Sequence, residues 1–358
     1  MTLLLTNEDA DEILTMNECI DALEGAYRDI ARGIATPGGR SVMVSETGQG
    51  DGVYALKMLG GIVPSLGVGA IRINSDILTW PESGGGMRRV KLPKAPGGRW
   101  VGLVLLFDIN TGEPLAIFPD GVVQRMRVAG TSGLGVKYMA REDATIAALI
   151  GSGWQAGSQV PALCAVRDIK LIRCFSPNAA RRQAFCQEMA AKTGVEMISA
   201  PSAEAAVRGA DIVLCATNSV GNVLDRDWIG PGMHITAIRD GEIAPAAIAA
   251  ADIVVIHHPA NLSADHIDAP EGLTIPDQSR EATSRDELKD LSGAPVLADV
   301  IIGKAAGRNS DADLTCFLNY HGLGFQFAAA GAAFFRKARA EGRGRELPTE
   351  WFTEDVHP

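Results

Sequence analysis

Hydrophobic residues between positions 7 and 32 recur at the spacing of an α-helix, and Gly33 ends the pattern. We therefore predict a pair of short helices near the start of the chain. From residue 40 to residue 119 the pattern changes to short apolar runs that are separated by Gly, Pro and Asn. Such runs predict a meander of β-strands. Residues 81–99 are rich in Gly, Pro and basic side chains, which indicates a long exposed loop.

The second half of the chain alternates short apolar runs with helical segments. The runs start at Thr145, Ile169, Val195, Asp211, His234 and Asp252. Continuous apolar runs of this length are typical of parallel strands that are buried on both faces. Helix start and stop signals lie between them and predict helices over residues 179–192 and 203–207. The alternation predicts a doubly wound α/β domain.

A predicted helix over residues 124–139 lies between the two patterns and is rich in small residues. We expect it to bridge two domains, because a chain of 358 residues exceeds the usual size of one domain. The apolar segment 314–339 is expected to return to the N-terminal domain as a helix. We predict an α+β domain from residues 1–125 with 315–358, and the doubly wound α/β domain from residues 126–314.

The charge balance argues against several classes of partner. The chain has 33 Lys and Arg against 43 Asp and Glu, a net charge of -10, which disfavours strong binding to nucleic acid or anionic lipid. No apolar run approaches the roughly 18 residues of a membrane span, and the N-terminus lacks the basic start of a secretory signal. We therefore expect a cytoplasmic protein without membrane contact. Its six cysteines form no Cys-x-x-Cys pair, so we predict neither a disulfide framework nor a metal site.

The turn after the first predicted strand of the α/β domain carries a glycine pattern. Its sequence is Gly151-Ser-Gly153-Trp154-Gln155-Ala156. A strand before it and a helix after it are the context that a dinucleotide-binding turn requires. Gly151 would make the tight turn, Gly153 would let a pyrophosphate approach the backbone, and Ala156 would let the helix pack closely. The alternative is a structural turn without a ligand; we favour nucleotide binding, with Trp154 and Gln155 in the site.

The residues after the second predicted strand bear on the choice between NAD and NADP. An NAD site usually offers an acid there, but this chain has Ser176 and Asn178 instead. Arg181 and Arg182 follow one helical turn later, so a 2′-phosphate can be bound and NADP is favoured over NAD. The alternative is that both arginines are solvated helix residues. Residues at the ends of later strands complete the predicted cofactor site: Thr217, Asn218, Ser219 and Ala237.

Several other segments are distinctive. They are Ala35-Thr-Pro-Gly-Gly-Arg40, Tyr54-Ala-Leu-Lys57-Met58, Arg125-Met-Arg127-Val-Ala-Gly130, Pro231-Gly-Met-His-Ile-Thr-Ala-Ile238 and Gly322-Leu-Gly-Phe-Gln-Phe327. Together with the glycine turn, they resemble the ornithine cyclodeaminase and mu-crystallin family along nearly the whole chain. The resemblance implies a Rossmann domain that binds NAD(P), a second domain that binds the substrate, and a homodimer that forms through this second domain.

The resemblance also implies how a substrate is held. Members of the family bind an amino or imino acid whose carboxylate is gripped by two arginines and a lysine, which here correspond to Arg40, Lys57 and Arg127. A forked guanidinium matches a carboxylate bidentately. Arg125 lies nearby in the sequence and competes with Arg127 for this role. The alternatives are an interdomain salt bridge for Arg127 and an exposed strand-edge position for Lys57.

The family uses an aspartate as acid and base toward the substrate nitrogen, and Asp240 corresponds to it with a gap in the match. Its place at the end of a parallel strand is where catalytic groups gather, and Glu242 or a structural turn are the alternatives. His321 is a candidate to approach the substrate or the nicotinamide. The alternative is that it is a packed residue between the two domains. His257 and His258 are adjacent in a strand and point to opposite faces, so we assign no metal to them.

These features predict an enzyme that reduces the C=N bond of a small 2-imino acid with NAD(P)H. In this prediction the arginines and Lys57 hold the carboxylate, while Asp240 manages protons. Two alternatives remain open. One is an ornithine cyclodeaminase, which converts ornithine to proline and ammonia with catalytic NAD. The other is a non-catalytic protein, similar to mu-crystallin, that binds the nucleotide.

Overall fold

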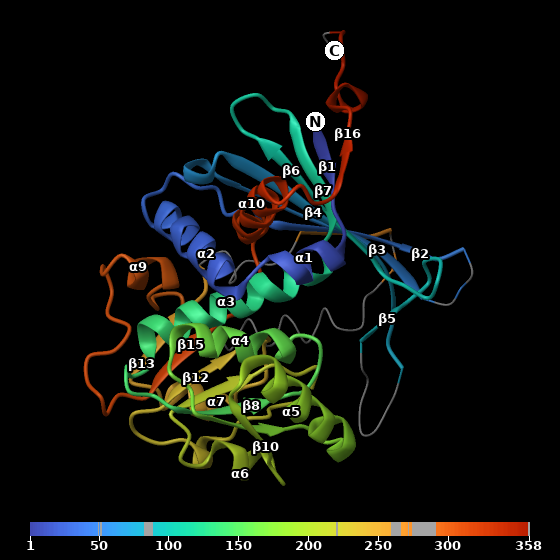
Figure 1. Ribbon diagram of the computed structural model, residues 1–358. Coiled ribbons are helices and arrows are strands. Elements are labelled where there is room, and N and C mark those ends of the chain that lie inside the picture. Colours follow the sequence, from blue (N-terminus) through green and yellow to red (C-terminus); the bar gives the residue numbers. More distant parts are fainter. Residues whose placement is uncertain are drawn as a thin grey trace. The chain divides into compact units, whose positions relative to one another are not determined.

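The computed structural model describes residues 1–48, 50, 52–81, 89–219, 221–258, 266–270, 272–273 and 291–356 of the chain. The chain divides into two compact units. The first comprises Met1–Arg127, Ala264–Ala282 and Leu323–Pro358, and the second comprises Val128–Ser263 and Thr283–Gly322. Each unit has its own β-sheet, as Figure 1 shows, and each is described by itself.

The first unit is built on a mixed sheet of nine strands, counted over the described residues. The strands are β1 (Thr2–Leu4), β2 (Arg40–Glu46), β3 (Val53–Val63), β4 (Val68–Thr79), β5 (Val90–Leu92), β6 (Val101–Asp108), β7 (Pro114–Pro119), β14 (His266–Asp268) and β16 (Arg345–Leu347). Their order is β14-β2-β3-β4-β6-β7-β1-β16, with β5 paired to β4. The antiparallel run from β2 to β7 is the predicted meander.

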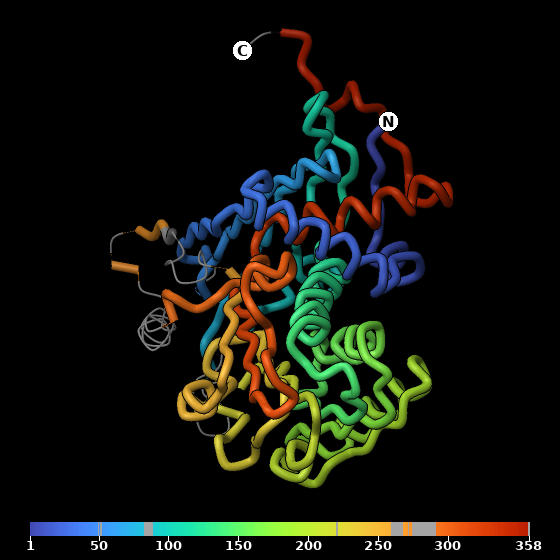
Figure 2. The backbone as a smooth tube through the Cα atoms, turned by 90° about the vertical axis from the view of Figure 1, so that its left-hand side faces the viewer, coloured from blue at the N-terminus to red at the C-terminus, as the bar shows by residue number. Residues whose placement is uncertain are grey.

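Three helices of the first unit are amphipathic or apolar segments that cover this sheet. Helices α1 (Asn7–Ile13) and α2 (Met16–Ala31) are the predicted pair, and their starts are stabilised by capping boxes at Thr6 and Thr15. Helix α10 (Gly324–Ala340) packs against β3, β4 and α2. Figure 2 shows this helix, drawn in red, next to the blue N-terminal segments.

Two glycines let α10 approach β3 closely. A Cβ on Gly61 would lie 2.1 Å from the backbone nitrogen of Phe325, and a Cβ on Gly324 would lie 1.8 Å from the carbonyl oxygen of Gly60. Both distances are far shorter than van der Waals contact, so only glycine fits at either position. The contact sets the start of α10 directly on the sheet, where Phe327 meets side chains of the first unit.

The second unit is a parallel sheet, with seven strands among the residues that the structure describes. They are β8 (Ile146–Ile150), β9 (Leu171–Phe175), β10 (Glu196–Ser199), β11 (Ile212–Cys215), β12 (His234–Ala237), β13 (Ile253–Ile256) and β15 (Thr315–Leu318). The order is β10-β9-β8-β11-β12-β15-β13, so the direction of winding reverses between β8 and β11. Ligands of such sheets bind at the carboxyl ends of the strands beside this reversal.

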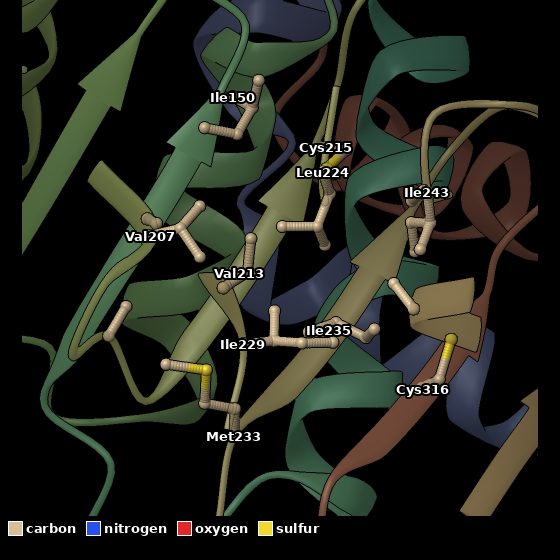
Figure 3. Close-up of a cluster of buried hydrophobic side chains, with 14 of the residues drawn as sticks. Ile150, Val207, Val213, Cys215, Leu224, Ile229, Met233, Ile235, Ile243 and Cys316 are labelled. Atoms are coloured by element: carbon tan, nitrogen blue, oxygen red, sulfur yellow. The ribbon is translucent and has the colours of Figure 1, made fainter. Parts of the chain in front are cut away.

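Helices on the faces of the parallel sheet bury its apolar strands. They are α4 (Ala156–Val166), α5 (Ala179–Thr193), α6 (Ala203–Val207), α7 (Pro245–Ala249) and α9 (Leu297–Ile301). Figure 3 shows one of the resulting cores, in which Val207 of α6 belongs to the same buried cluster as Ile150, Val213, Ile235 and Cys316 of four neighbouring strands. This burial explains why the strands read as continuous apolar runs. No described helix is long and apolar enough to cross a membrane.

The domain boundaries differ from the prediction in two places. Residues 315–318 form β15 between β12 and β13, so this segment belongs to the second unit, and the first unit resumes only at Leu323. The other boundary falls after Arg127, inside helix α3 (Gly121–Met139). A short apolar run is compatible with either a strand or a helix, so the sequence pattern alone did not separate β15 from α10.

Two other segments also need correction. Strand β14 was expected inside the α/β domain, but it pairs in parallel with β2 of the first unit. Of the loop predicted at residues 81–99, residues 82–88 lie outside the described part of the chain. The rest contains β5, which pairs with the end of β4, so it is not wholly irregular.

Candidate functional site

The glycine turn after β8 has the geometry that a phosphate-binding turn needs. Gly151 has a φ of 119°, and a Cβ there would lie 2.2 Å from the carbonyl oxygen of Ala216, so only glycine fits. The place that a Cβ of Gly153 would take has no described heavy atom within 4 Å beyond its chain neighbours. Helix α4 then starts at Ala156 without a side-chain cap, and the N–H groups of Gly157 and Ser158 donate to the carbonyl oxygens of Gly153 and Gln155 at 3.3 and 3.2 Å.

Polar residues after β9 lie beside this turn. The hydroxyl oxygen of Ser176 is 2.7 Å from that of Ser152 in the glycine turn. The side-chain oxygen of Asn178 caps α5 by accepting a hydrogen bond from the N–H of Arg181 at 2.9 Å. The Arg181 side chain is exposed, as is that of Trp154. Gln155 immediately precedes the first residue of α4.

Arg182 is held by the protein itself. Its Nε donates a hydrogen bond to the Ser199 hydroxyl at 2.8 Å, and its Nη1 donates to the carbonyl oxygen of Ser176. Its guanidinium also lies 5.3 Å from the centre of the Phe175 ring, and the residue is buried. The alternative of a solvated side chain is therefore wrong for Arg182. The Arg181 side chain is exposed, and its contact with a cofactor stays a prediction.

A buried carboxylate joins the loops that follow β11 and β12. Oε1 of Glu242 accepts hydrogen bonds from the backbone N–H of Thr217 at 2.6 Å and from its hydroxyl at 2.7 Å. Oε2 accepts from the N–H groups of Ile238 at 3.2 Å and Arg239 at 3.1 Å. Burial raises the pKa of Glu242 to about 7, although the hydrogen bonds from Thr217 oppose this shift. Glu242, expected as an alternative catalytic acid, thus acts as an internal anchor for two loops.

The other predicted cofactor residues on these loops have different surroundings. Asn218 is exposed, and the N–H of Ser219 donates to the Thr217 hydroxyl oxygen at 3.2 Å. Ala237, the last residue of β12, is fully buried in the core. Its side chain packs inside the sheet, and its role in cofactor binding stays a prediction.

Asp240 lies in the loop after β12 and pairs with a histidine that follows β15. Its Oδ2 is 2.8 Å from Nε2 of His321, and the two side chains are 14% and 19% exposed. The other carboxylate oxygen, Oδ1, is buried and accepts no hydrogen bond from the described residues. The structure therefore brings together two residues that the sequence analysis considered separately.

In the first unit, charged side chains line one face of the sheet. Arg40 and Arg72 flank Leu59 in one row across β2, β3 and β4, and Lys57 is directly opposite Asn74 in the next row. Residues opposite each other, or two apart on a strand, share a face of the sheet. We call the following set the polar face: Arg40, Lys57, Arg72, Asn74 and Asp76.

Two carboxylates neutralise part of the polar face. Oδ2 of Asp120 accepts hydrogen bonds from Nε of Arg72 at 2.7 Å and from Nδ2 of Asn74 at 3.0 Å. Oδ2 of Asp76 lies 3.3 Å from Nζ of Lys57 and 2.9 Å from Nζ of Lys91. Both carboxylates are buried, so each ion pair replaces lost hydration by direct contacts.

Lys57 has a strongly shifted proton affinity. Burial lowers the pKa of Lys57 to about 7, and the nearby Arg89 and Lys91 act in the same direction, whereas Asp76 opposes them. Its side chain is buried, which excludes the exposed strand-edge alternative. An ammonium group with this pKa exchanges protons near neutral pH and gains from a second negative partner.

Arg127 lies on α3 and is buried against the start of α10. Its Nη1 donates a hydrogen bond to Oε1 of Gln326 at 2.9 Å, and its guanidinium lies 4.9 Å from the centre of the Phe327 ring. The Arg72 guanidinium lies 5.3 Å from the same ring. Burial lowers the pKa of Arg127 to about 9, and the positive charges of Arg72 and Arg40 add to the shift. The buried Arg127 therefore lies near two partly buried arginines, Arg72 and Arg40.

Arg125 has a different role from Arg127. Its Nη2 forms an ion pair with Oδ1 of Asp11 on α1. The pair attaches the start of α3 to α1, so Arg125 is not placed with the arginines around Phe327. Arg127, and not Arg125, contacts Gln326 and the Phe327 ring, whereas the choice between them as substrate ligand stays a prediction.

Sequence reasoning missed the polar residues of β4 and their partner. Arg72, Asn74 and Asp76 lie at alternate positions of a strand whose other face carries Ile71, Ile73 and Ile77, interrupted only by Ser75, which is a recognisable period-two signal. Asp120 carries no such local signal, because its role depends on Arg72, which is 48 residues away. The sequence pattern likewise does not predict that the Phe327 ring contacts two arginines, Arg72 and Arg127.

A parallel sheet with an open glycine turn at its point of reversal is the architecture of a dinucleotide-binding protein. The model of the ornithine cyclodeaminase/mu-crystallin family matches residues 94–339. The chain belongs to this family, which confirms the predicted family and the Rossmann-type α/β fold.

Individual relatives agree with this assignment. The chain is 30% identical over 251 residues to a Delta(1)-pyrroline-2-carboxylate reductase of Bacillus cereus, covering 69% of this chain and 74% of that protein. It is 29% identical over 258 residues to an ornithine cyclodeaminase of Agrobacterium fabrum, covering 71% and 68%. The fold is similar to that of Thermococcus litoralis Delta(1)-pyrroline-2-carboxylate reductase in complex with NADH and L-proline, with a TM-score of 0.75, 24% identity and coverage of 97% and 100%.

Proposed function

We propose that this protein is an NAD(P)H-dependent oxidoreductase that reduces the C=N bond of a small 2-imino acid. The observation that carries the proposal is the positive charge gathered around the polar face. Burial and neighbouring cations lower the pKa values of both Arg127 and Lys57. A carboxylate bound between them favours the charged form of each cation and relieves their mutual repulsion. The relatives named as reductases and cyclodeaminases support an enzyme that acts on such a carboxylate.

The carboxyl edge of the parallel sheet supplies the place for the cofactor. Gly151 and Gly153 provide the turn and the open backbone, and Ser176 and Asn178 border the turn where the cofactor's ribose is expected. A bound reduced nicotinamide supplies the hydride for the reaction. The exposed Arg181 and the lack of an acid after β9 support NADP as the preferred form, with NAD as the alternative.

The protein's own groups perform the remaining steps. Arg40 and Arg127 hold the substrate carboxylate, and Lys57 binds it as a cation or exchanges a proton, since its pKa is about 7. Reduction of an imine adds one hydride at carbon and one proton at nitrogen. Asp240 supplies this proton, and its Oδ1 has no hydrogen-bond partner among the described residues.

The test is a loss of absorbance at the reduced-nicotinamide band, measured with NADPH and NADH in parallel. The substrates are cyclic 2-imino acids, and 2-oxo acids with ammonia or methylamine. We expect turnover with at least one imino acid and a higher kcat/KM with NADPH. A higher kcat/KM with NADH overturns the cofactor preference but leaves the reaction class in place.

Two other outcomes replace the proposal by a different function. Ammonia release from ornithine with catalytic NAD, without imine reduction, means that the protein is a cyclodeaminase, as the Agrobacterium fabrum relative suggests. Nucleotide binding without either activity means a binding protein. Arg127→Ala separates these cases, because an enzyme loses turnover while its nucleotide affinity is kept, whereas a binding protein has no turnover to lose.

We also infer that the protein is a homodimer that forms through the sheet of the first unit. The side of this sheet opposite the polar face is apolar. Ile62, Val101 and Leu103 are 42%, 40% and 38% exposed there, and the register places further apolar residues beside them. We call this set the apolar face: Met58, Ile62, Ile71, Ile73, Val101 and Leu103. An apolar patch that spans three strands is typical of an interface between subunits.

The oligomeric state tests this inference directly. Light scattering coupled to gel filtration should give twice the chain mass of 37.7 kDa for the unmodified protein and a monomer for Leu103→Asp. Ile198→Asp is the matched control, because Ile198 is 43% exposed on a strand of the second unit. A monomeric unmodified protein, or dissociation by the control alone, contradicts the proposed interface.

A cytoplasmic location stays a prediction. All six cysteines are free thiols, and five of them are buried. Free thiols are typical of a reducing compartment, which supports this location.

A further inference from the structure

The segment after β15 is held in place by contacts within the second unit. The side-chain amide of Asn319 donates hydrogen bonds to the carbonyl oxygen of Val128 at 3.0 Å and to the hydroxyl of Ser132 at 2.9 Å. The carbonyl oxygen of Tyr320 lies 3.1 Å from Nδ1 of His257. Asn319 and Tyr320 are buried, so these contacts replace hydration that both residues have lost. The segment is therefore rigid up to the residue that follows.

That next residue, His321, has an unusual backbone. Its φ is 46°, and among the described residues it is the one non-glycine residue with a positive φ. This conformation is unfavourable for a residue with a Cβ and is maintained only where the surroundings require it. In this conformation the His321 side chain contacts Asp240, with Nε2 of His321 2.8 Å from Oδ2 of the carboxylate.

Strand pairing explains why the two residues meet. Strands β12 and β15 are parallel neighbours, with Ala237 opposite Leu318 at their carboxyl ends. Asp240 and His321 each follow within three residues, so both lie at the same edge of the sheet. This is the edge at which the glycine turn also lies, because β8 runs parallel to these strands.

We propose that His321 is the positioning residue for Asp240, which it orients and resupplies with protons. This inference rests on the proposed imine reduction. Asp240 transfers its proton to the substrate nitrogen as hydride from the reduced nicotinamide reaches carbon. The carboxyl O–H bond and one C–H bond of the cofactor would break, and one amine N–H bond and one substrate C–H bond would form. The carboxylate then takes a proton from the His321 imidazolium, and the neutral imidazole takes one from water. No other oxidant, reductant or co-reactant is needed.

The charges around the pair are consistent with proton transfer along this route. Tyr320 precedes His321 in the chain and is electrostatically coupled to both Asp240 and Glu242, and Arg239 precedes Asp240 in its loop. Burial raises the pKa of Tyr320 well above its usual range, with Asp240 and Glu242 adding to the shift, so the phenol stays neutral. Glu242 is occupied by the loops it anchors. The His321 ring keeps 19% exposure and so retains contact with water.

The first test does not depend on turnover. The ring signals of His321 are followed by NMR against pH in protein with ¹³C-labelled histidine, and they are assigned by their loss in His321→Gln. In Asp240→Asn the carboxylate partner is absent, so we expect the chemical shifts of the His321 ring to change, because its hydrogen bond to a charged oxygen is lost. Unchanged ring shifts of His321 in Asp240→Asn overturn the proposal.

The second test separates proton transfer from simple packing. His321→Gly suits the positive φ and removes the side chain, and His321→Gln keeps a hydrogen-bond donor that does not titrate. We expect kcat to fall about 10²-fold in both, with KM for the imino acid within about twofold in His321→Gln. Added imidazole should restore part of kcat in His321→Gly. The matched control is His234→Gln, since His234 is hydrogen bonded to Thr315 at the opposite ends of the same two strands.

The outcomes can be told apart from a failure of the proposed function. If His321→Gln keeps the full kcat and the pH profile of the unmodified enzyme, His321 has only a structural role and the proposal is wrong. If the unmodified protein reduces no imino acid, the proposed function fails. The NMR titration then still decides whether His321 and Asp240 are linked.

Discussion

Both units bury charged groups, but they neutralise them in different ways. In the first unit the charges lie on strands, and side chains pair with them: Arg72 with Asp120, and Lys57 with Asp76. In the second unit the buried carboxylate of Glu242 lies in a loop. It accepts hydrogen bonds from three backbone N–H groups and one hydroxyl. The first arrangement depends on charge, and the second depends on the path of the backbone.

This difference has consequences for how each region responds to substitution. Loss of one member of a side-chain pair leaves a buried charge without its partner, which changes the electrostatics that a bound carboxylate experiences. Loss of the Glu242 acceptor leaves backbone N–H groups unsatisfied and loosens two loops at the edge of the sheet. We therefore expect the polar face to respond to changes of charge and the loop edge to changes of shape.

The largest effect is expected at Arg127. Arg127→Ala removes a buried cation that we place on the substrate carboxylate, so kcat/KM should fall about 10³-fold with nucleotide affinity within about twofold. Steady-state kinetics and nucleotide titration measure the two quantities. Arg125→Ala is the matched control, because Arg125 pairs with Asp11 and should change kcat/KM less than about fivefold. Equal losses in the two variants would contradict the assignment.

The next largest effect is expected for the pair of Arg72 and Asp120. Asp120→Ala leaves the buried Arg72 without its carboxylate and should lower the free energy of unfolding by about 3 kcal/mol. Urea unfolding measures this change. Asp143→Ala is the matched control, because it breaks an ion pair with Arg141 in which the aspartate side chain is 80% exposed. It should lower the free energy of unfolding by less than about 0.5 kcal/mol. Similar costs for both variants would show that burial does not set the strength of the first pair.

A smaller effect with a distinctive pH dependence is expected at Glu242. Its pKa is raised from 4.5 to about 7, so between these pH values the folded protein binds more protons than the unfolded chain. The free energy of unfolding therefore falls as pH rises through this window. Glu242→Gln should lower the free energy of unfolding by about 1–2 kcal/mol at pH 5, because the NH₂ group of the glutamine faces backbone N–H donors. The difference between this variant and the unmodified protein should shrink above pH 7.

Urea unfolding at several pH values tests the expectation for Glu242. The matched control is Glu204→Gln, since Glu204 is paired with Arg208 on the surface of α6. Parallel pH profiles for the unmodified protein and Glu242→Gln would mean that Glu242 does not titrate in this window.

The smallest effect is expected for the stability contribution of Lys57. Its pKa is lowered from 10.5 to about 7, so between these values the unfolded chain binds more protons than the folded protein. The stability of the unmodified protein should therefore rise with pH across this window. Lys57→Met should lack about 1 kcal/mol of this rise between pH 7 and pH 8 in thermal or urea unfolding. Lys304→Met, at an exposed lysine, should retain the full rise.

The sequence by itself determined those parts of the protein whose signals are local. Helix α6 has the predicted bounds, Ala203–Val207, because its cap and its end lie within a few residues of each other. The glycine turn was found because a strand, two glycines and a helix start within one short segment suffice to define it. The apolar runs of the parallel sheet were equally clear, since burial on both faces leaves no polar position inside a strand.

Tertiary structure alone decided the partners of the buried polar groups. Arg127 and Gln326 are 199 residues apart, and Asp240 and His321 are 81 residues apart, yet each pair forms one hydrogen bond. Strand β15 became the neighbour of β12 for the same reason, because pairing depends on the order of strands in space. A side chain's surroundings, and hence its charge and its chemistry, are set by residues that sequence spacing does not bring near it.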